Sequence, residues 1–271
     1  MPGELRAELA KQARRPASWL LLAVGVVLSL TFGYIVPYAG LSGTGPAGGR
    51  GPAAMLPEQF AGSALGGLPV FVGALALIYG VLVAGSEYGW ETWKTVFAQG
   101  PSRATVYGAK LVAVATGALV LVLALFAMAA GASALVAALL DQPAHWPGFA
   151  TIVRGLGAGW LITMMWATLG VALAIVFRSV ALPIGLGLVW MLAVQNLLAS
   201  VAAPLLDWVA TAQRGLPGPN AGSLVAGLGG LESAPGVTAL VGSGQAALVV
   251  TGYLVAFAAA GGWLLRRRDI S

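Results

Sequence analysis

The chain has 271 residues, of which 59% are apolar and only 8% are charged, and its mean hydropathy is +0.89. A soluble domain carries about 25% charged residues because its surface must face water, so this composition argues against a soluble protein and favours a membrane protein. Cysteine is absent and His145 is the single histidine, which excludes disulfides and thiolate sites. We expect neither catalytic residues nor a bound metal on this chain.

The net charge of +5 does not indicate a nucleic-acid partner, because the basic residues fall between apolar runs and form no separate basic domain. The predicted fold class is an all-α membrane protein with six transmembrane helices, built as a single transmembrane domain over residues 1–271.

The first predicted element is an amphipathic helix over residues 3–15. Leu5, Leu9 and Ala13 share one helical face. The charged residues crowd the other side, namely Glu4, Glu8, Lys11 and Arg15. Such a helix can lie flat in the membrane interface with its basic face toward lipid phosphates, either as a simple anchor or as an elbow that moves with the transport core. The residues expected to act in the elbow are Leu5, Leu9, Arg14 and Arg15.

Six apolar segments follow, each able to cross about 30 Å of hydrocarbon, which needs about 20 residues. The predicted spans are residues 18–37, 68–85, 105–140, 156–177, 183–203 and 245–265. The first is too long for the apolar core of a signal peptide, so we expect a retained helix. The glycine- and proline-rich residues 40–66 and 204–244 are predicted external connections, and the apolar stretch 223–231 could dip back into the membrane.

Basic residues predict the orientation. Three of the 14 fall on one side of the spans, Arg50, Arg154 and Arg214, and the other 11 fall on the opposite side. Because cytoplasmic loops carry the excess of Lys and Arg, both termini are predicted to be cytoplasmic.

The connection between the second and third spans contains a predicted short helix over residues 88–99. Trp90, Trp93 and Phe97 form one stripe at helical spacing. Gly100-Pro101 ends the helix, and Ser102 is placed to cap the next one. The aromatic stripe fits two interpretations equally well: an anchor for a protein partner, or an aromatic belt resting on the bilayer.

Polar residues within the spans are scarce. Gln195-Asn196 is the one strongly polar pair well inside a span. It can act as hydrogen-bonding glue between helices, or it can line a translocation path or the seam of a dimer.

Several short patterns resemble the ABC-2 family of ABC exporter permeases. In that family an acidic residue ends the second span, and a short helix is followed by a Pro-Ser-Arg turn and a lysine entering the third span. Glu87, Pro101-Ser102-Arg103 and Lys110 match this order. The ending Arg267-Arg268-Asp269-Ile270 and the entry Glu4-Leu5, Arg14-Arg15-Pro16 and Trp19 are also similar. One departure is visible, because Glu91 precedes Thr92 where the family often has Gly-Thr.

The resemblance implies that residues 88–99 form the coupling helix that docks on a separate ATP-binding cassette subunit. The ATPase-coupling residues would be Glu87, Trp90, Glu91, Trp93, Lys94, Phe97 and Arg103. Two permeases, as a homodimer or with a close paralogue, would work with two ATPases among membrane lipids. ATP and Mg would be bound by the partner, since this chain has no G-x-x-x-x-G-K-[ST] motif.

These features favour the permease of an exporter for a hydrophobic or amphipathic substrate (a drug, a lipid or a lipid-linked molecule) in the plasma membrane. The alternative is a secondary carrier or channel, which predicts charges at the midplane or two related halves. An intramembrane serine protease would need Gly-x-Ser-Gly together with a histidine in a later span, and a metalloprotease would need a His-Glu motif. The single histidine, His145, lies in a short predicted outer loop and is followed by tryptophan, so an enzyme is not favoured.

Overall fold

Long helices dominate the computed structural model, which describes residues 2–41, 51–89 and 102–267. Within these ranges five helical stretches are long and apolar enough to cross a membrane: Pro16–Leu41, Phe71–Gly89, Arg103–Leu139, Phe149–Phe177 and Ser243–Arg267. The same ranges contain no strand. The all-α prediction is therefore confirmed, whereas the count of six spans stays a prediction.

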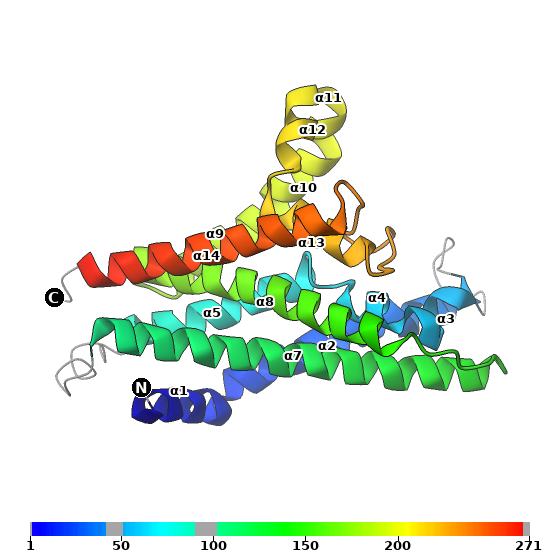
Figure 1. Cartoon of the computed structure of the whole chain (residues 1–271), viewed down its shortest axis with the longest axis horizontal. Coiled ribbons are helices and arrows are strands. Elements are labelled where there is room, and N and C mark those ends of the chain that lie inside the picture. Colours follow the sequence, from blue (N-terminus) through cyan, green and yellow to red (C-terminus); the bar gives the residue numbers. More distant parts are fainter. Residues whose placement is uncertain (1, 42–50, 90–101, 268–271) are drawn as a thin grey trace.

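The five stretches correspond to labelled elements of Figure 1. The first joins α2 (Pro16–Leu30), the π-helical η1 (Thr31–Ile35) and α3 (Val36–Leu41), and it follows α1 (Pro2–Arg14). The others are α5 (Phe71–Gly89), α7 (Arg103–Leu139), α8 (Phe149–Phe177) and α14 (Ser243–Arg267). Helix α5 continues to Gly89, so Tyr88 and Gly89 of the expected coupling helix belong to it, and residues 90–99 lie outside the described residues.

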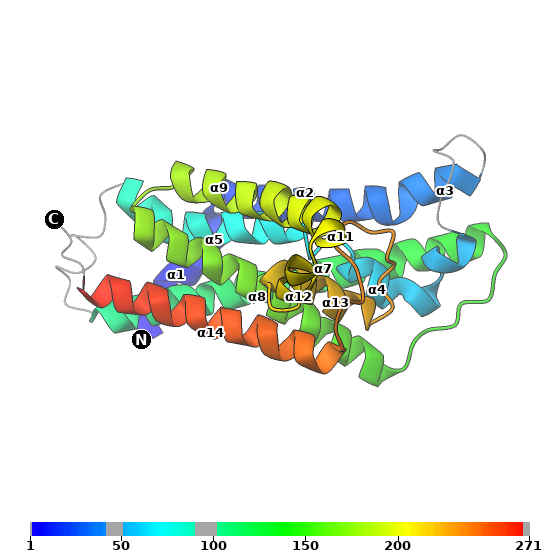
Figure 2. The ribbon, with the colours of Figure 1, turned by 90° about the horizontal axis from the view of Figure 1, so that it is seen from above.

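The helices lie side by side along one long axis (Figures 1 and 2). Helix α1, the last turn of α5, the first turn of α7 and the last turn of α14 lie at one end of the bundle, which we call the proximal end; the opposite end is the distal end. Helices α8 and α14 both run toward the proximal end. The chain between them must therefore return toward the distal end.

That returning segment is irregular. It consists of α9 (Ala181–Leu188), the π-helical η4 (Val189–Val194), α10 (Gln195–Leu197), the π-helical η5 (Leu198–Ala202) and α11 (Ala203–Leu205). Helix α9 packs on α5 and α8, but α11 and the following α12 (Asp207–Gln213) project sideways from the bundle (Figure 1). The expected fifth span, 183–203, lies within this stretch, which is helical at every residue from 181 to 205 and alternates between α- and π-helical turns; its crossing of the membrane stays a prediction.

The core lies between α5 and α8, where glycines let the two backbones touch. A Cβ on Gly80 would overlap the carbonyl oxygen of Ala167, and a Cβ on Gly170 would overlap that of Leu77. Trp166 is fully buried beside this seam. Small residues at such crossings leave room for the two backbones to come into direct contact, which is a common way for helices to associate in membranes.

The two long connections, predicted to be external, fold onto the bundle. The first holds η2 (Pro52–Met55), η3 (Pro57–Gln59) and α4 (Phe60–Leu65), and α4 packs against α7 and α8. The second holds α13 (Pro217–Ala226), which is buried along most of its length against α14. The Ser223 hydroxyl accepts hydrogen bonds from the amides of Leu240 and Val241, which holds the following loop on α13. Residues 223–226 thus lie in a buried helix.

Candidate functional site

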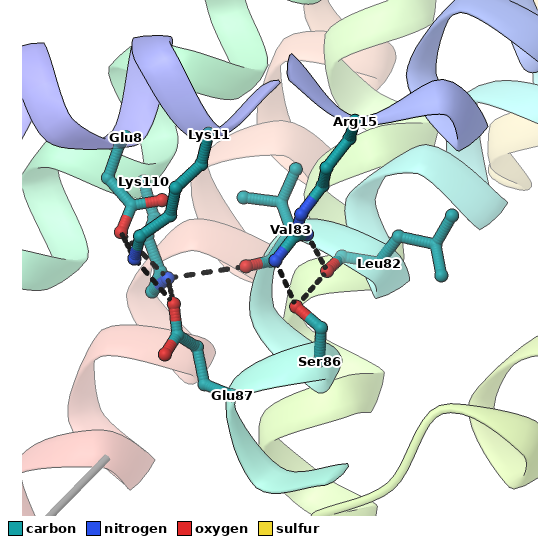
Figure 3. Close-up of polar contacts among 8 residues, drawn as sticks. All are labelled: Glu8, Lys11, Arg15, Leu82, Val83, Ser86, Glu87 and Lys110. Carbon is teal, nitrogen blue, oxygen red and sulfur yellow. Dashed lines mark hydrogen bonds and ion pairs between the residues drawn. The ribbon is translucent and has the colours of Figure 1, made fainter. Parts of the chain in front are cut away.

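Four charged side chains meet at the proximal end and form a closed ring, which we call the ion cluster: Glu8, Lys11, Glu87 and Lys110 (Figure 3). Lys11 Nζ lies 2.9 Å from Glu8 Oε1 and 2.8 Å from Glu87 Oε1. Lys110 Nζ lies 3.1 Å and 2.9 Å from the same two oxygens. Each ammonium therefore bridges both carboxylates, and α1, α5 and α7 are joined at one point.

The ion cluster is largely buried. The side chain of Lys110 is 1% exposed, and that of Glu87 is 4% exposed. Lys110 donates its three ammonium hydrogens to Glu8, Glu87 and the carbonyl oxygen of Val83. Two cations and two anions balance, which is the condition under which buried charges are tolerated.

Lys11 sits at the open side of the cluster, with its side chain 36% exposed. Burial acts to lower the pKa of Lys11, but its hydrogen bonds to Glu87 and Glu8 outweigh burial and raise the pKa above 10.5. Lys11 is therefore fully charged at neutral pH, and both bonds to the carboxylates are charge-assisted.

Arg15 makes a second link between the N-terminal region and α5. Its guanidinium donates to the carbonyl oxygen of Leu82 at 3.0 Å and to the hydroxyl of Ser86 at 2.9 Å. The Ser86 hydroxyl in turn donates to the Leu82 carbonyl at 2.7 Å. The turn between α1 and α2 is thereby fastened to the last turns of α5 (Figure 3).

Arg103 opens α7 and ties it to the end of α14. Its guanidinium donates to the carbonyl oxygens of Leu265 at 3.1 Å and Arg266 at 3.3 Å, which are end groups that a helix leaves without intrahelical partners. Ser102 caps α7 by accepting a hydrogen bond from the amide of Thr105, as the sequence predicts. The residues that flank segment 90–101 are thus held by α1 on one side and by α14 on the other.

The N-terminal helix differs from the expected interfacial arrangement. Glu8 and Gln12 are buried and Lys11 is half-buried, while Leu5 and Leu9 are only half-buried. The polar face that was expected to face lipid phosphates turns toward α5 and α7, because it finds Glu87 and Lys110 there. Arg6 and Arg14 remain exposed. The elbow role of this helix stays a prediction.

The other expected coupling residues, Trp90, Glu91, Trp93, Lys94 and Phe97, lie outside the described residues. Glu87 and Arg103 are described and lie at the proximal end. Sequence reasoning did not assign Glu8 and Lys11 to this site, although an i, i+3 acid–base pair in a chain with so few charges was the available signal.

Gln195 and Asn196 are separated by the structure. Gln195 is buried, and its amide lies so close to Gly218 of α13 that a Cβ there would overlap it. Asn196 is exposed and donates to the Leu192 carbonyl of its own helix at 2.8 Å. Gln195 therefore contacts α13 with its Nε2 buried and without a hydrogen-bond partner among the described residues, whereas Asn196 turns outward. The roles of this pair, as hydrogen-bonding glue or as lining of a path or seam, stay predictions.

The described residues contain no group of three His, Cys, Asp or Glu side chains that could hold a metal ion. The arrangement can couple the movements of several helices. Charge-assisted hydrogen bonds join α1, α5, α7 and α14 around the two ends of segment 90–101.

An all-helical chain with several membrane-spanning helices and this charged junction at one end defines a multi-pass membrane protein. Residues 4–194 match the family described as "ABC-2 family transporter protein". The match covers more than two thirds of the chain, so the protein belongs to the ABC-2 transporter family. It is therefore the membrane permease of an ABC transporter, whose ATPase is a separate partner. No match was found among curated proteins.

Proposed function

We propose that this permease exports a hydrophobic or amphipathic substrate, driven by ATP that a cytoplasmic cassette subunit hydrolyses with Mg. The observation that carries the proposal is the ion cluster, which joins α1, α5 and α7 beside the two ends of segment 90–101. A displacement of that segment, the proposed coupling helix, would move α1, α5 and α7 together. The hydrogen bond from Arg103 would transmit the displacement to α14.

The proposed cycle uses two permeases, as a homodimer or with a close paralogue. ATP binding brings the two ATPases together, and each displaces its coupling segment. The linked helices of each permease then rock as a unit and open a path at the dimer interface. The spans carry few charges, so the path would suit a drug, a lipid or a lipid-linked substrate. Substrates of this kind favour export as the direction of transport.

The proposed orientation places the proximal end in the cytoplasm and the protein in the plasma membrane. Eleven of the 14 basic residues lie on the side assigned to the cytoplasm. The parallel course of α8 and α14 requires a return between them, and α9 to α11 would provide the sixth crossing. Both termini are then cytoplasmic.

Co-purification with the ATPase encoded beside this gene tests the coupling role. We expect the ATPase to co-purify with the wild type and to be lost from Trp90→Ala/Trp93→Ala/Phe97→Ala. The matched control is Phe149→Ala/Trp208→Ala, which removes exposed aromatic side chains away from the proximal end and should leave binding intact.

Two results would count against the proposal. A monodisperse wild type that binds no ATPase favours the secondary carrier, which should then transport without ATP. Retention of the ATPase by the triple variant would show that residues 90–97 only rest on the bilayer.

A further inference from the structure

A cavity of about 390 Å³ lies beside the ion cluster, within the range typical of small-molecule sites. Its walls come from α1, α2, α5 and α7, with Thr163 of α8 contributing. Helix α1 therefore contributes to two features: Glu8 and Lys11 belong to the ion cluster, whereas Leu9, Gln12 and Ala13 line the cavity.

The lining is almost entirely apolar and carries no charged side chain. The hydroxyls of Tyr79, Thr116 and Thr163 are occupied, because they donate to the backbone carbonyls of Ala113, Val112 and Gly159. The wall therefore presents few free hydrogen-bonding groups to a polar ligand. A hydrocarbon chain is the ligand that its apolar surface would bind best.

The cavity has a polar mouth and an apolar interior. Gln12 lies in the last turn of α1 and Ser18 in the first turn of α2, on either side of the turn that Arg15 fastens to α5. Along α7 the lining extends from Ala113 to Leu121, eight residues or about 12 Å deeper into the bundle. Trp19 and Val120 line the cavity and are 56% and 42% exposed, so the cavity opens sideways where lipid lies.

The mouth has polar features that suit a headgroup. Gln12 is 9% exposed; its Oε1 accepts from Ser18, but its Nε2 has no partner among the described residues. A buried donor without a partner costs free energy, and a ligand oxygen could satisfy it. The exposed Arg14 directly follows Ala13, a residue of the lining, in the chain, and basic residues near a membrane surface attract anionic headgroups.

We propose that this cavity binds one acyl chain of an anionic phospholipid from the leaflet at the proximal end, with the headgroup at Gln12, Ser18 and Arg14. The bound chain packs against Leu9 and Ala13 of α1. It thereby stabilises the helix that the ion cluster fastens to α5 and α7.

Photo-crosslinking in liposomes tests this site without any ATPase, so it is independent of the proposed function. The probe is phosphatidylglycerol with a diazirine in one acyl chain, diluted into phosphatidylcholine. We expect saturable labelling of the wild type, mapped to α2 and α7 and competed by unlabelled phosphatidylglycerol.

Two variants fill the cavity from different walls. Thr116→Phe and Ala13→Phe replace exposed residues of the lining, so each should fold. Excluding two methylene groups of the chain should weaken binding about tenfold. Leu123→Phe is the matched control, because Leu123 is 47% exposed on α7 but does not line the cavity.

The control should label like the wild type. Labelling that never saturates, or that is equal in Thr116→Phe, Ala13→Phe and Leu123→Phe, would show only general contact with bilayer lipid and would overturn the site. Competition by phosphatidylcholine as strong as that by phosphatidylglycerol would overturn the anionic headgroup.

Discussion

Lys110 holds together the proximal end of the permease. It is 1% exposed and donates to Glu8 of α1 and to Glu87 and Val83 of α5. Glu8 and Glu87 are neutralised by Lys11 and Lys110 together. Removal of either lysine would leave a buried negative charge without compensation, which is costly in free energy. The four residues should therefore behave as one energetic unit.

The first prediction concerns the loss of Lys110. Lys110→Met leaves Glu8 and Glu87 with Lys11 alone and should destabilise the protein by about 3–5 kcal/mol, measured by denaturant unfolding in detergent. Arg154→Met removes an exposed basic residue from α8 and should change stability by less than about 0.5 kcal/mol. Glu87→Gln should cost less in the Lys110→Met background than in the wild type; additive losses would contradict a coupled cluster.

The second prediction is a pH dependence that follows from Lys11. Its pKa is raised in the fold, so the stabilisation it provides is fully present below its unfolded pKa and is lost as pH rises through the folded value. The difference in Tm between wild type and Lys11→Met should be constant from about pH 7 to 10 and shrink above about pH 10.4. A difference that disappears below pH 9 would show that Lys11 is not stabilised as a cation.

At the scale of elements, the seam between α5 and α8 determines how close the core helices lie. Gly80 and Gly170 each face a backbone carbonyl of the other helix. Such a contact has no room for a methyl group, because backbone atoms cannot move aside as a flexible side chain can.

The third prediction tests that seam. Gly80→Ala should force α5 and α8 apart and destabilise the protein by about 1–3 kcal/mol. Gly157→Ala is the matched control, because nothing lies within 4 Å of a Cβ placed at Gly157 of α8, and it should be neutral or slightly stabilising. Thermal unfolding of both variants measures the difference; equal melting temperatures would mean that the seam can relax.

At the scale of the whole molecule, the direction of each helix determines how the permease sits in the bilayer. The ends of α5 and α14 and the starts of α1 and α7 lie together at the proximal end (Figure 1). Placing that end in the cytoplasm would put the described basic residues of α1, of the first turns of α7 and at the ends of α8 and α14 on the cytoplasmic side.

The fourth prediction tests the orientation. The chain lacks cysteine, so single cysteines can be labelled without background. Gln142→Cys, in the exposed connection between α7 and α8, should react with a membrane-impermeant maleimide on intact cells. Ala7→Cys, on the exposed side of α1, should react only after permeabilisation. Reversed accessibility would invert the topology, and labelling of both on intact cells would contradict an intact crossing pattern.

The sequence by itself determined the class of protein, the long apolar helices and the residues that resemble the ABC-2 pattern. These depend on composition and local order: a run of apolar residues predicts a span wherever it packs, and Ser102 caps α7 because the cap lies three residues from its partner. Glu87 and Arg103 were also recognised from local motifs.

Only the tertiary structure decided which charges meet. Glu8 and Lys110 are 102 residues apart in the chain, and no periodicity within α1 indicates that its polar face turns inward. The alternation of α- and π-helical turns in residues 181–205 and the burial of α13 likewise depend on the shape of the neighbouring helices. Helix periodicity reports which residues share a face, whereas the partner of that face is set by packing between segments distant in sequence.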